Sequence, residues 1–115
     1  MNLLENVQTL TEAGKLTEAL KTVQDALQQQ PDDLNSKKAA AAVYYELMKN
    51  DYDAQDLDGA IDWYAKYYVL QLPEEETAIH EQFKVYQRRI HPEFAKMQEA
   101  SKRYKHQPTF TKATL

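Results

Sequence analysis

One stretch, residues 13–31, constrains the fold more than any other part of the sequence. It reads AGKLTEALKTVQDALQQQP and combines a glycine, a helix-forming run and a closing proline. Gly14 can adopt the left-handed conformation that ends a preceding helix, and Pro31 forces the residue before it out of the helical region. The apolar residues of a helix over 16–30 fall on one stripe: Leu16, Ala19, Leu20, Val23, Ala26 and Leu27. The stretch therefore predicts a turn, one amphipathic helix and a stop.

A second helix is expected on the N-terminal side of this turn, over residues 3–13. Asn2 can cap it, and Glu5, three positions later, can complete a capping box. The apolar residues that repeat on its inner face are Leu3, Val7 and Leu10. Because the link between the two helices is very short, they are predicted to lie antiparallel as a helical hairpin.

Four further helices are expected along the rest of the chain. The pattern predicts them over 34–50, over 57–72, from Pro73 to about residue 90, and over 92–105. Asp32 or Asp33 can cap the first of these, and Pro73 with three following glutamates is typical of a helix start. The acidic stretch 51–59 is interpreted as a solvated hairpin tip, since its spacing does not fit a calcium-binding loop.

Apolar residues mark the inner sides of these four helices. The helix over 57–72 is apolar on more than one face, which is typical of a helix that is central or covered by a partner. The inner residues expected in the other three are Ala41, Tyr44, Tyr45 and Met48, then Ile79, Phe83, Tyr86 and Ile90, then Phe94, Met97, Tyr104 and either Ala100 or Ser101.

The composition agrees with an all-α chain. Helix-forming residues dominate, glycine and proline are few, and no segment alternates β-branched and polar residues as a strand would. At 115 residues the chain can bury one core. We therefore expect a single all-α domain over 1–106, built from about five to six helices in antiparallel hairpins, followed by a flexible tail over 107–115.

Several functional classes have little support in the sequence. Cysteine is absent, which removes thiolate chemistry and disulfides and fits a reducing compartment. The three histidines lack a spacing that would place two of them on one metal, and no phosphate-binding loop or nucleophile motif is present. No signal peptide or membrane-length apolar run is found. We expect a soluble, cytoplasmic, non-catalytic protein with no cofactor and no metal.

The hairpin pattern resembles the tetratricopeptide repeat, a 34-residue helical hairpin that stacks into a superhelix. In the first unit, the matching residues are Gly14, Ala19, Ala26, Leu27 and Pro31. A second unit follows 34 residues later for the first helix, where Ala41 and Tyr44 match, but 41 residues later for the second helix. The difference is an insertion of seven residues within 45–59, which is about two helical turns and keeps the buried face aligned. The third unit matches weakly.

The resemblance implies a protein-interaction module that binds a peptide or helix in a groove lined by the first helix of each hairpin. The carboxylate-clamping variant is not expected, because Leu4 and Gln8 stand near the positions that need a lysine and an asparagine. The residues we predict to contact a partner are Tyr45, Trp63, Tyr67, Lys84 and Arg88. The partner itself is not specified by the sequence.

The aromatic residues of the second hairpin have two interpretations. Tyrosine and tryptophan are frequent anchors at interfaces, but they can also fill a wide hairpin. We interpret Tyr44, Tyr64 and Tyr68 as core residues. For Trp63, Tyr67 and Tyr45, a core position and an interface position remain equally open. An exposed apolar face of the helix over 57–72 would also be compatible with a homodimer.

Charge is unevenly distributed and supports one alternative function. Residues 1–83 hold sixteen acidic and six basic side chains, whereas residues 84–115 hold two acidic and eight basic ones. The alternative is a nucleic-acid-associated accessory domain, whose contacts would be Arg88, Arg89, Lys102, Arg103 and Lys105. An overall pI near 5.3 argues against a dedicated nucleic-acid binder, so protein binding is favoured.

Overall fold

The computed structural model describes residues 2–89, which form five α-helices and no strand. The helices are α1 (Leu3–Glu12), α2 (Leu16–Gln29), α3 (Leu34–Asp53), α4 (Leu57–Leu70) and α5 (Thr77–Arg89). The predicted all-α fold class is confirmed. The helix expected over 92–105, its junction at Ile90 and the tail expected over 107–115 lie outside the described residues.

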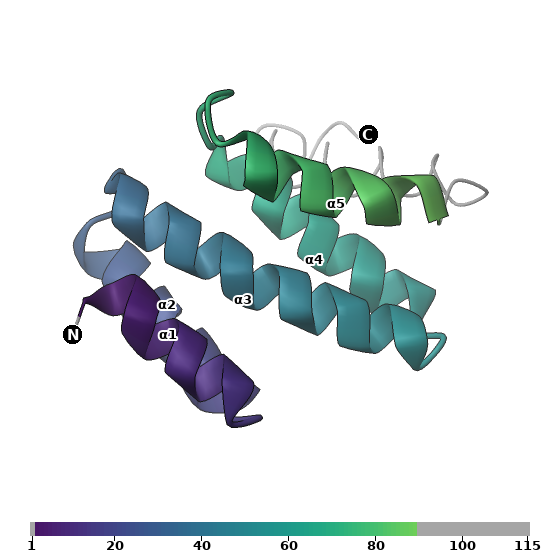
Figure 1. Cartoon of the computed structure of the whole chain (residues 1–115), viewed down its shortest axis with the longest axis horizontal. Helices are drawn as coiled ribbons and strands as arrows, with labels where there is room; N and C mark the ends of the chain where they lie inside the picture. The colour runs from purple at the N-terminus through teal and green to yellow at the C-terminus, as the bar shows by residue number, and fades with distance from the viewer. Residues whose placement is uncertain (1, 90–115) are drawn as a thin grey trace, which may run out of the picture.

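Two antiparallel hairpins, α1–α2 and α3–α4, stack side by side, and α5 follows them. Figure 1 shows α1, α3 and α5 on the near side of the molecule, with α2 and α4 behind them. Helix α3 lies at the centre, because it packs against each of the other four described helices. The structure therefore places α3, rather than the more apolar α4, in the middle of the described fold.

The first hairpin turn follows from the glycine at its corner. Gly14 has a φ of +78°, and its amide donates to the carbonyl of Thr11 at 3.0 Å. The amide of Lys15 donates to the carbonyl of Leu10 at 2.8 Å. These two bonds form a Schellman motif, which satisfies carbonyls at the end of α1 and turns the chain into α2.

The second hairpin turn has the same geometry without a glycine. Gln55 has a φ of +65°, and its amide donates to the carbonyl of Tyr52 at 3.0 Å. The amide of Asp56 donates to the carbonyl of Asp51 at 2.8 Å. Gln55 stands 41 positions after Gly14, the same offset that relates α2 to α4. The two hairpins therefore turn alike although only one turn has the residue that favours it.

Side chains cap the starts of α1, α3 and α4, and the first two of these caps were expected. Asn2 and Glu5 form the reciprocal capping box of α1, with the Glu5 amide donating to Asn2 Oδ1 at 2.8 Å. Asp33, rather than Asp32, caps α3 by accepting from the amide of Ser36 at 2.9 Å. Asp56 caps α4 by accepting from the amide of Gly59 at 3.0 Å.

Two predicted boundaries are wrong. Helix α3 continues through Asp51–Asp53, which were expected in an acidic loop, because the turn that ends it depends on Gln55, a residue that gives no sequence signal for a helix end. Helix α5 begins at Thr77, not at Pro73. Residues 71–76 form a link instead, in which the amide of Glu76 donates to the carbonyl of Pro73 at 3.0 Å.

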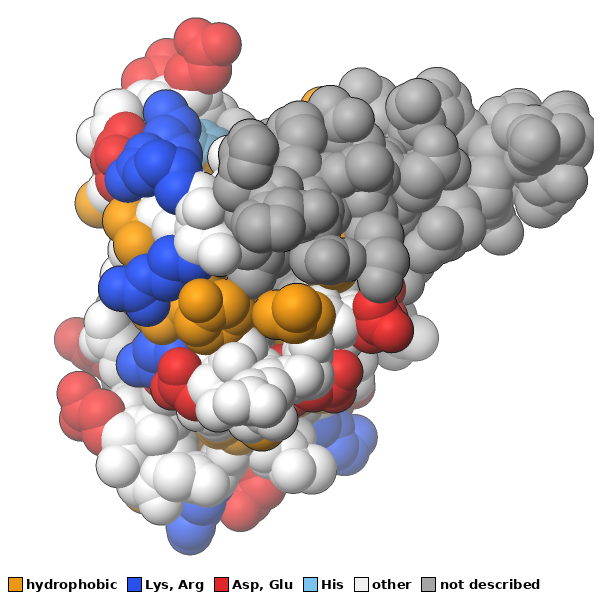
Figure 2. All heavy atoms as spheres, turned by 90° about the vertical axis from the view of Figure 1, so that its right-hand side faces the viewer, with side chains coloured by type: hydrophobic (Ala, Val, Ile, Leu, Met, Phe, Trp, Pro, Cys, Tyr) orange, Lys and Arg blue, Asp and Glu red, His pale blue; other side chains and the backbone are white. Residues whose placement is uncertain are grey.

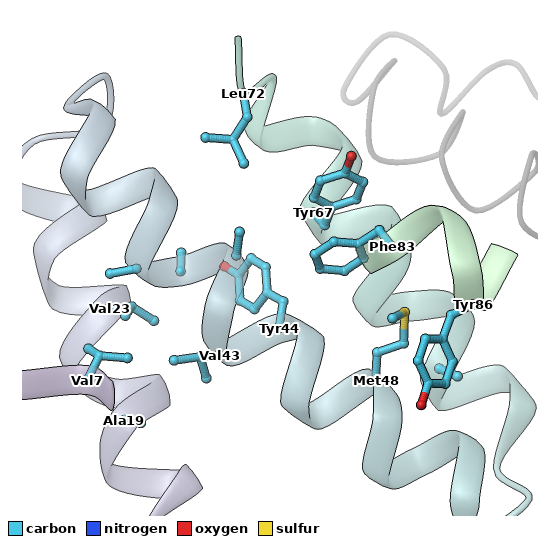
Figure 3. Packing of buried hydrophobic residues seen from close by; sticks show 14 residues of the cluster. Val7, Ala19, Val23, Val43, Tyr44, Met48, Tyr67, Leu72, Phe83 and Tyr86 are labelled. Atoms are coloured by element: carbon cyan, nitrogen blue, oxygen red, sulfur yellow. The ribbon is translucent and has the colours of Figure 1, made fainter. Parts of the chain in front are cut away.

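The core side chains are small where helices cross closely and aromatic elsewhere. Ala39, Ala40 and Ala41 are fully buried in α3, and Ala41 was expected on its inner side. Figure 3 shows Val7, Ala19, Val23 and Val43 together at one end of the core, and Tyr67, Phe83 and Tyr86 at the other. Tyr68, which was expected inside, is 44% exposed, because α4 turns Tyr64 and Tyr67 toward α5 instead.

No helix among residues 2–89 is both long enough and apolar enough to span a membrane.

Candidate functional site

Two surfaces of the described fold carry the residues of interest. The first is the side on which α1, α3 and α5 lie next to one another, and we name it the α1–α3–α5 face. Its aromatic and basic members on α3 and α5 are Lys38, Tyr45, Lys49, Tyr86 and Arg89. In Figure 2, where this face is seen in profile at the left, basic (blue) and hydrophobic (orange) side chains lie close together.

Tyr45 is the aromatic centre of the α1–α3–α5 face. Its half-buried ring meets Phe83 and Tyr86 edge-on, with centroid distances of 5.8 Å and 5.7 Å. Edge-to-face geometry at this distance is favourable for aromatic pairs, so α3 and α5 hold the Tyr45 ring in a fixed orientation. A fixed, partly exposed tyrosine is a suitable contact for a partner, because little side-chain entropy remains to be lost on binding.

Two cations lie over the aromatic rings of this face. Lys49 Nζ is 5.6 Å from the centroid of the Tyr45 ring, and the Arg89 guanidinium carbon is 4.8 Å from that of Tyr86. Lys49 also pairs with Glu46 at 3.2 Å, and this hydrogen bond raises the pKa of the lysine. Burial raises the pKa of the Tyr86 hydroxyl, so this ring stays neutral beside the arginine.

One end of the α1–α3–α5 face is closed by an ion pair between α3 and the link before α5. Lys38 Nζ lies 3.4 Å from Glu76 Oε1, and the two side chains are 32% and 22% exposed. This pair joins the second hairpin to α5. The face therefore combines a tyrosine pair, positive charge and an ion pair at its edge.

The second surface is a hollow between α4 and α5, which we name the α4–α5 groove. Two adjoining hollows of about 400 Å³ and about 320 Å³ share Tyr64, Tyr67, Leu72 and His80. From α5, Thr77, Glu81, Lys84 and Gln87 complete the larger hollow. One wall of the groove is thus aromatic and belongs to α4, while the other is polar and belongs to α5.

Tyr67 joins these two walls. Its ring stacks on Phe83 with a centroid distance of 3.7 Å and an interplanar angle of 4°. Its hydroxyl is hydrogen-bonded to His80 Nδ1, and His80 Nε2 lies 2.9 Å from the carbonyl oxygen of Pro73. Because a carbonyl can only accept, His80 Nε2 donates to Pro73, and in the neutral imidazole Nδ1 then accepts from the Tyr67 hydroxyl. Burial, with a smaller contribution from Tyr64, raises the pKa of Tyr67 to about 12.

Trp63 lies apart from both surfaces, at the contact between α3 and α4. Its indole Nε1 donates to Asp51 Oδ2 at 3.1 Å, and its ring packs on Tyr44 with a centroid distance of 5.6 Å. Lys66 Nζ lies 4.5 Å from the ring centroid on α4. The tryptophan thus joins the lengthened end of α3 to α4.

The five residues predicted to contact a partner do not form one surface. Tyr45 lies on the α1–α3–α5 face, whereas Tyr67 and Lys84 line the α4–α5 groove. Tyr67 is only 8% exposed, and Lys84 pairs with Glu81 at 3.7 Å. Arg88 is exposed near the end of α5.

Of the residues predicted for nucleic-acid contact, two are described. Arg88 and Arg89 are exposed in the last turn of α5, and Arg89 covers the Tyr86 ring. Lys102, Arg103 and Lys105 lie outside the described residues. Over residues 2–89, no group of three or more histidine, aspartate or glutamate side chains is arranged to hold a metal ion.

The protein contacts predicted from the sequence do not include Lys49, Tyr86 and Arg89, which lie on the α1–α3–α5 face. Their signal was available as spacing, since Lys49 follows Tyr45 by four residues and Arg89 follows Tyr86 by three. Residues at these spacings share a helix face, and a cation there can cover the ring.

Comparisons with models of known protein families, with curated proteins and with solved structures gave no match.

Proposed function

We propose that this chain is a non-catalytic protein-interaction module, similar to a tetratricopeptide array, that binds a peptide or helix on the α1–α3–α5 face. The observation that supports this most is the alignment of α1, α3 and α5 side by side. Tyr45 of α3 is held there by Phe83 and Tyr86 of α5. The absence of cysteine further favours a cytoplasmic setting for this function.

The chemistry of the face favours a partner that carries carboxylates next to an apolar side chain. Lys38, Lys49 and Arg89 supply positive charge, and the Tyr45 ring supplies an apolar contact. Lysines already paired with Glu46 and Glu76 can exchange those partners for a carboxylate of the ligand at little cost, because partly exposed ion pairs are weak. Aromatic anchors with a charged rim are the usual anatomy of such interfaces.

A charge-reversal experiment tests the proposal. Proteins captured from a native extract by the full chain would be identified, and the dissociation constant of each purified partner measured. Lys49→Glu with Arg89→Glu should weaken binding by at least about tenfold, or about 1.4 kcal/mol. The control is Lys21→Glu, which reverses one exposed lysine on α2, away from this face, and makes half the charge change of the double variant.

Equal affinity of the wild type and the Lys49→Glu, Arg89→Glu variant for every partner would contradict this proposal. Loss of binding in the Lys21→Glu control to the same extent would also contradict it, because the effect would then reflect net charge alone. Weakening by Tyr45→Ser, with α-helical content unchanged by circular dichroism, would identify the aromatic contact.

A further inference from the structure

The α4–α5 groove has two walls of different chemistry along its whole length. Tyr64 and Tyr67 on α4 form an apolar wall, and Leu72 closes one end. The α5 wall runs from Thr77 to Gln87 and carries Glu81 and Lys84, which pair at 3.7 Å, and Glu74 in the link before α5 adds a second carboxylate. Such a groove fits an amphipathic helix whose apolar side lies on α4 and whose basic side lies toward the carboxylates of Glu74 and Glu81.

The sequence that follows α5 has this character. Over 92–105, Phe94, Met97 and Tyr104 recur on one side of a predicted helix, and Lys102, Arg103 and Lys105 add positive charge. Residues 92–105 hold four basic and two acidic side chains, whereas residues 2–89 hold nine basic and sixteen acidic ones. The segment and the rest of the chain are therefore complementary in charge.

The connection also has the right place and length. Groove residues on α5 extend to Gln87, and the helix ends at Arg89, so residues after Arg89 leave α5 at one mouth of the groove. His91 precedes Pro92, which disfavours helical backbone at residue 91 and favours a change of direction. A helix over 92–105 would be about 21 Å long, close to the length of α5.

From these observations, we infer that the α4–α5 groove is the docking site for the chain's own segment 92–105. The aromatic side chains of the segment pack against Tyr64 and Tyr67, and its basic side chains lie near Glu74 and Glu81. A segment tethered two residues from α5 has an effective local concentration in the millimolar range or above, which a free peptide does not reach. Its occupancy of the groove leaves the α1–α3–α5 face available to a separate partner.

This docking has a consequence for the basic residues of the segment. Lys102, Arg103 and Lys105 would lie against carboxylates of the same molecule and would be less available to nucleic-acid phosphates. The inference therefore predicts weak nucleic-acid binding by the full chain, independently of whether the α1–α3–α5 face binds a protein.

A spin label in the full chain tests the inference. Because the sequence has no cysteine, Glu99→Cys provides a single attachment site for a nitroxide within the segment. The amide signals of Tyr64, Tyr67, His80 and Lys84 should be broadened in nuclear magnetic resonance spectra. The matched control is a nitroxide at Gln28→Cys, an exposed position on α2, which should leave these four signals sharp.

A mixed sample distinguishes docking within one chain from docking between two chains. It contains nitroxide-bearing protein without ¹⁵N and ¹⁵N-enriched protein without a nitroxide. Sharp groove signals in this mixture support docking within the chain, and broadening there overturns it in favour of a second copy. Groove signals that stay sharp in the singly labelled full chain overturn the inference as well. None of these outcomes depends on a partner for the α1–α3–α5 face.

A pair of phenylalanine variants gives a second measurement. Phe94→Ser should accelerate amide exchange in α5 by about a hundredfold if the ring is buried in the groove. Phe110→Ser removes the same ring outside 92–105 and should leave exchange unchanged. Equal effects of the two variants would contradict docking by residues 92–105.

Discussion

The α2–α3 junction and the α4–α5 junction differ in the size of the side chains that fill them, which are small at the first and aromatic at the second. At the first, Val23 on α2 packs among small residues of α3, and the two helices approach closely. At the second, α4 and α5 are joined mainly through the stacked rings of Tyr67 and Phe83. Small side chains permit close backbone contact, whereas large rings hold helices apart and leave a hollow beside them.

The difference traces to a few substitutions at equivalent positions. Helices α2 and α4 both have fourteen residues and are related by an offset of 41, which pairs Val23 with Tyr64 and Ala26 with Tyr67. The link before α5 covers residues 71–76, and the link before α3 covers residues 30–33. Larger side chains and a longer link together separate α5 from α4. The same hairpin geometry can thus produce either a closed junction or one with a groove.

The largest expected effect comes from the ring on which the second junction depends. Phe83→Ala should lower the free energy of unfolding by about 3–5 kcal/mol, because it removes a fully buried ring that stacks on Tyr67 and contacts Tyr45 and Tyr64. Urea titration followed by circular dichroism measures this change. Val23→Ala is the matched truncation at the first junction and should cost less. A cost for Val23→Ala equal to that of Phe83→Ala would remove the proposed contrast.

Adding side-chain volume should cost more at the first junction than at the second, the reverse of the order for truncation. Ala39→Leu, at a fully buried position of α3, should cost about 1–3 kcal/mol by overpacking. Thr77→Leu adds similar bulk at the exposed rim of the α4–α5 groove and should change stability by less than about 0.5 kcal/mol. Both values are obtained from thermal and urea unfolding. If Ala39→Leu is tolerated as well as Thr77→Leu, the first junction is not closely packed.

The second junction should also be selectively sensitive to alkaline pH. The pKa of Tyr67 is about 12 in the folded chain and 10.0 for an ordinary tyrosine, so the folded state holds this proton more tightly. Its contribution is fully present below pH 10 and is lost as the pH rises through 12, on the order of 2 kcal/mol in total. Unfolding titrations between pH 8 and 12 measure the slope.

Tyr67→Phe serves as the control for this pH dependence. It removes the hydrogen bond to His80, at a cost of about 1 kcal/mol at neutral pH, and it removes the titrating group. The stability of the variant should fall less steeply between pH 10 and 12 than that of the wild type. Identical slopes would show that other groups account for alkaline unfolding, such as Tyr44 and Tyr64, whose pKa values are also raised.

The smallest effect is expected at the two hairpin turns. Gln55→Gly should stabilise the second hairpin by up to about 1 kcal/mol, because a non-glycine residue at φ +65° is strained. Gly14→Gln should destabilise the first hairpin by a similar amount, because a φ of +78° is strained for glutamine. No atom lies within 4 Å of the added Cβ, so steric crowding does not contribute. Melting temperatures of the two single variants and of the double variant provide the test. Effects of the same sign in both turns would contradict their equivalence.

Much of the described fold could be predicted from the sequence, and its limits have physical causes. The bounds of α1, α2 and α4 were predicted closely, because Gly14, Pro31 and regular apolar spacing mark them. The end of α3 was not predicted closely, because Gln55 adopts a left-handed conformation that glycine or asparagine usually adopts at a helix end. Pro73 was expected to start a helix, but the chain uses it in the longer link before α5.

The candidate sites were less predictable than the helices. Helix α4 is apolar on more than one side, so its periodicity alone could not decide whether Tyr67 or Tyr68 points inward. Phe83 decides it, because its ring stacks on Tyr67 and leaves Tyr68 at the surface. That contact joins positions sixteen residues apart, and no local pattern reveals it. The α1–α3–α5 face likewise depends on α5 lying beside α3, which is a tertiary feature.

The central position of α3 has a consequence for how the molecule unfolds. In a linear array, each unit depends only on its neighbours, and one end can open while the other stays folded. Here α3 contacts α1, α2, α4 and α5, so the described helices share one helix as a common support. Opening α3 removes the packing of all of them at once. We expect residues 2–89 to unfold as one cooperative unit, with amide exchange slowest in α3 and similar for the helices on either side of it.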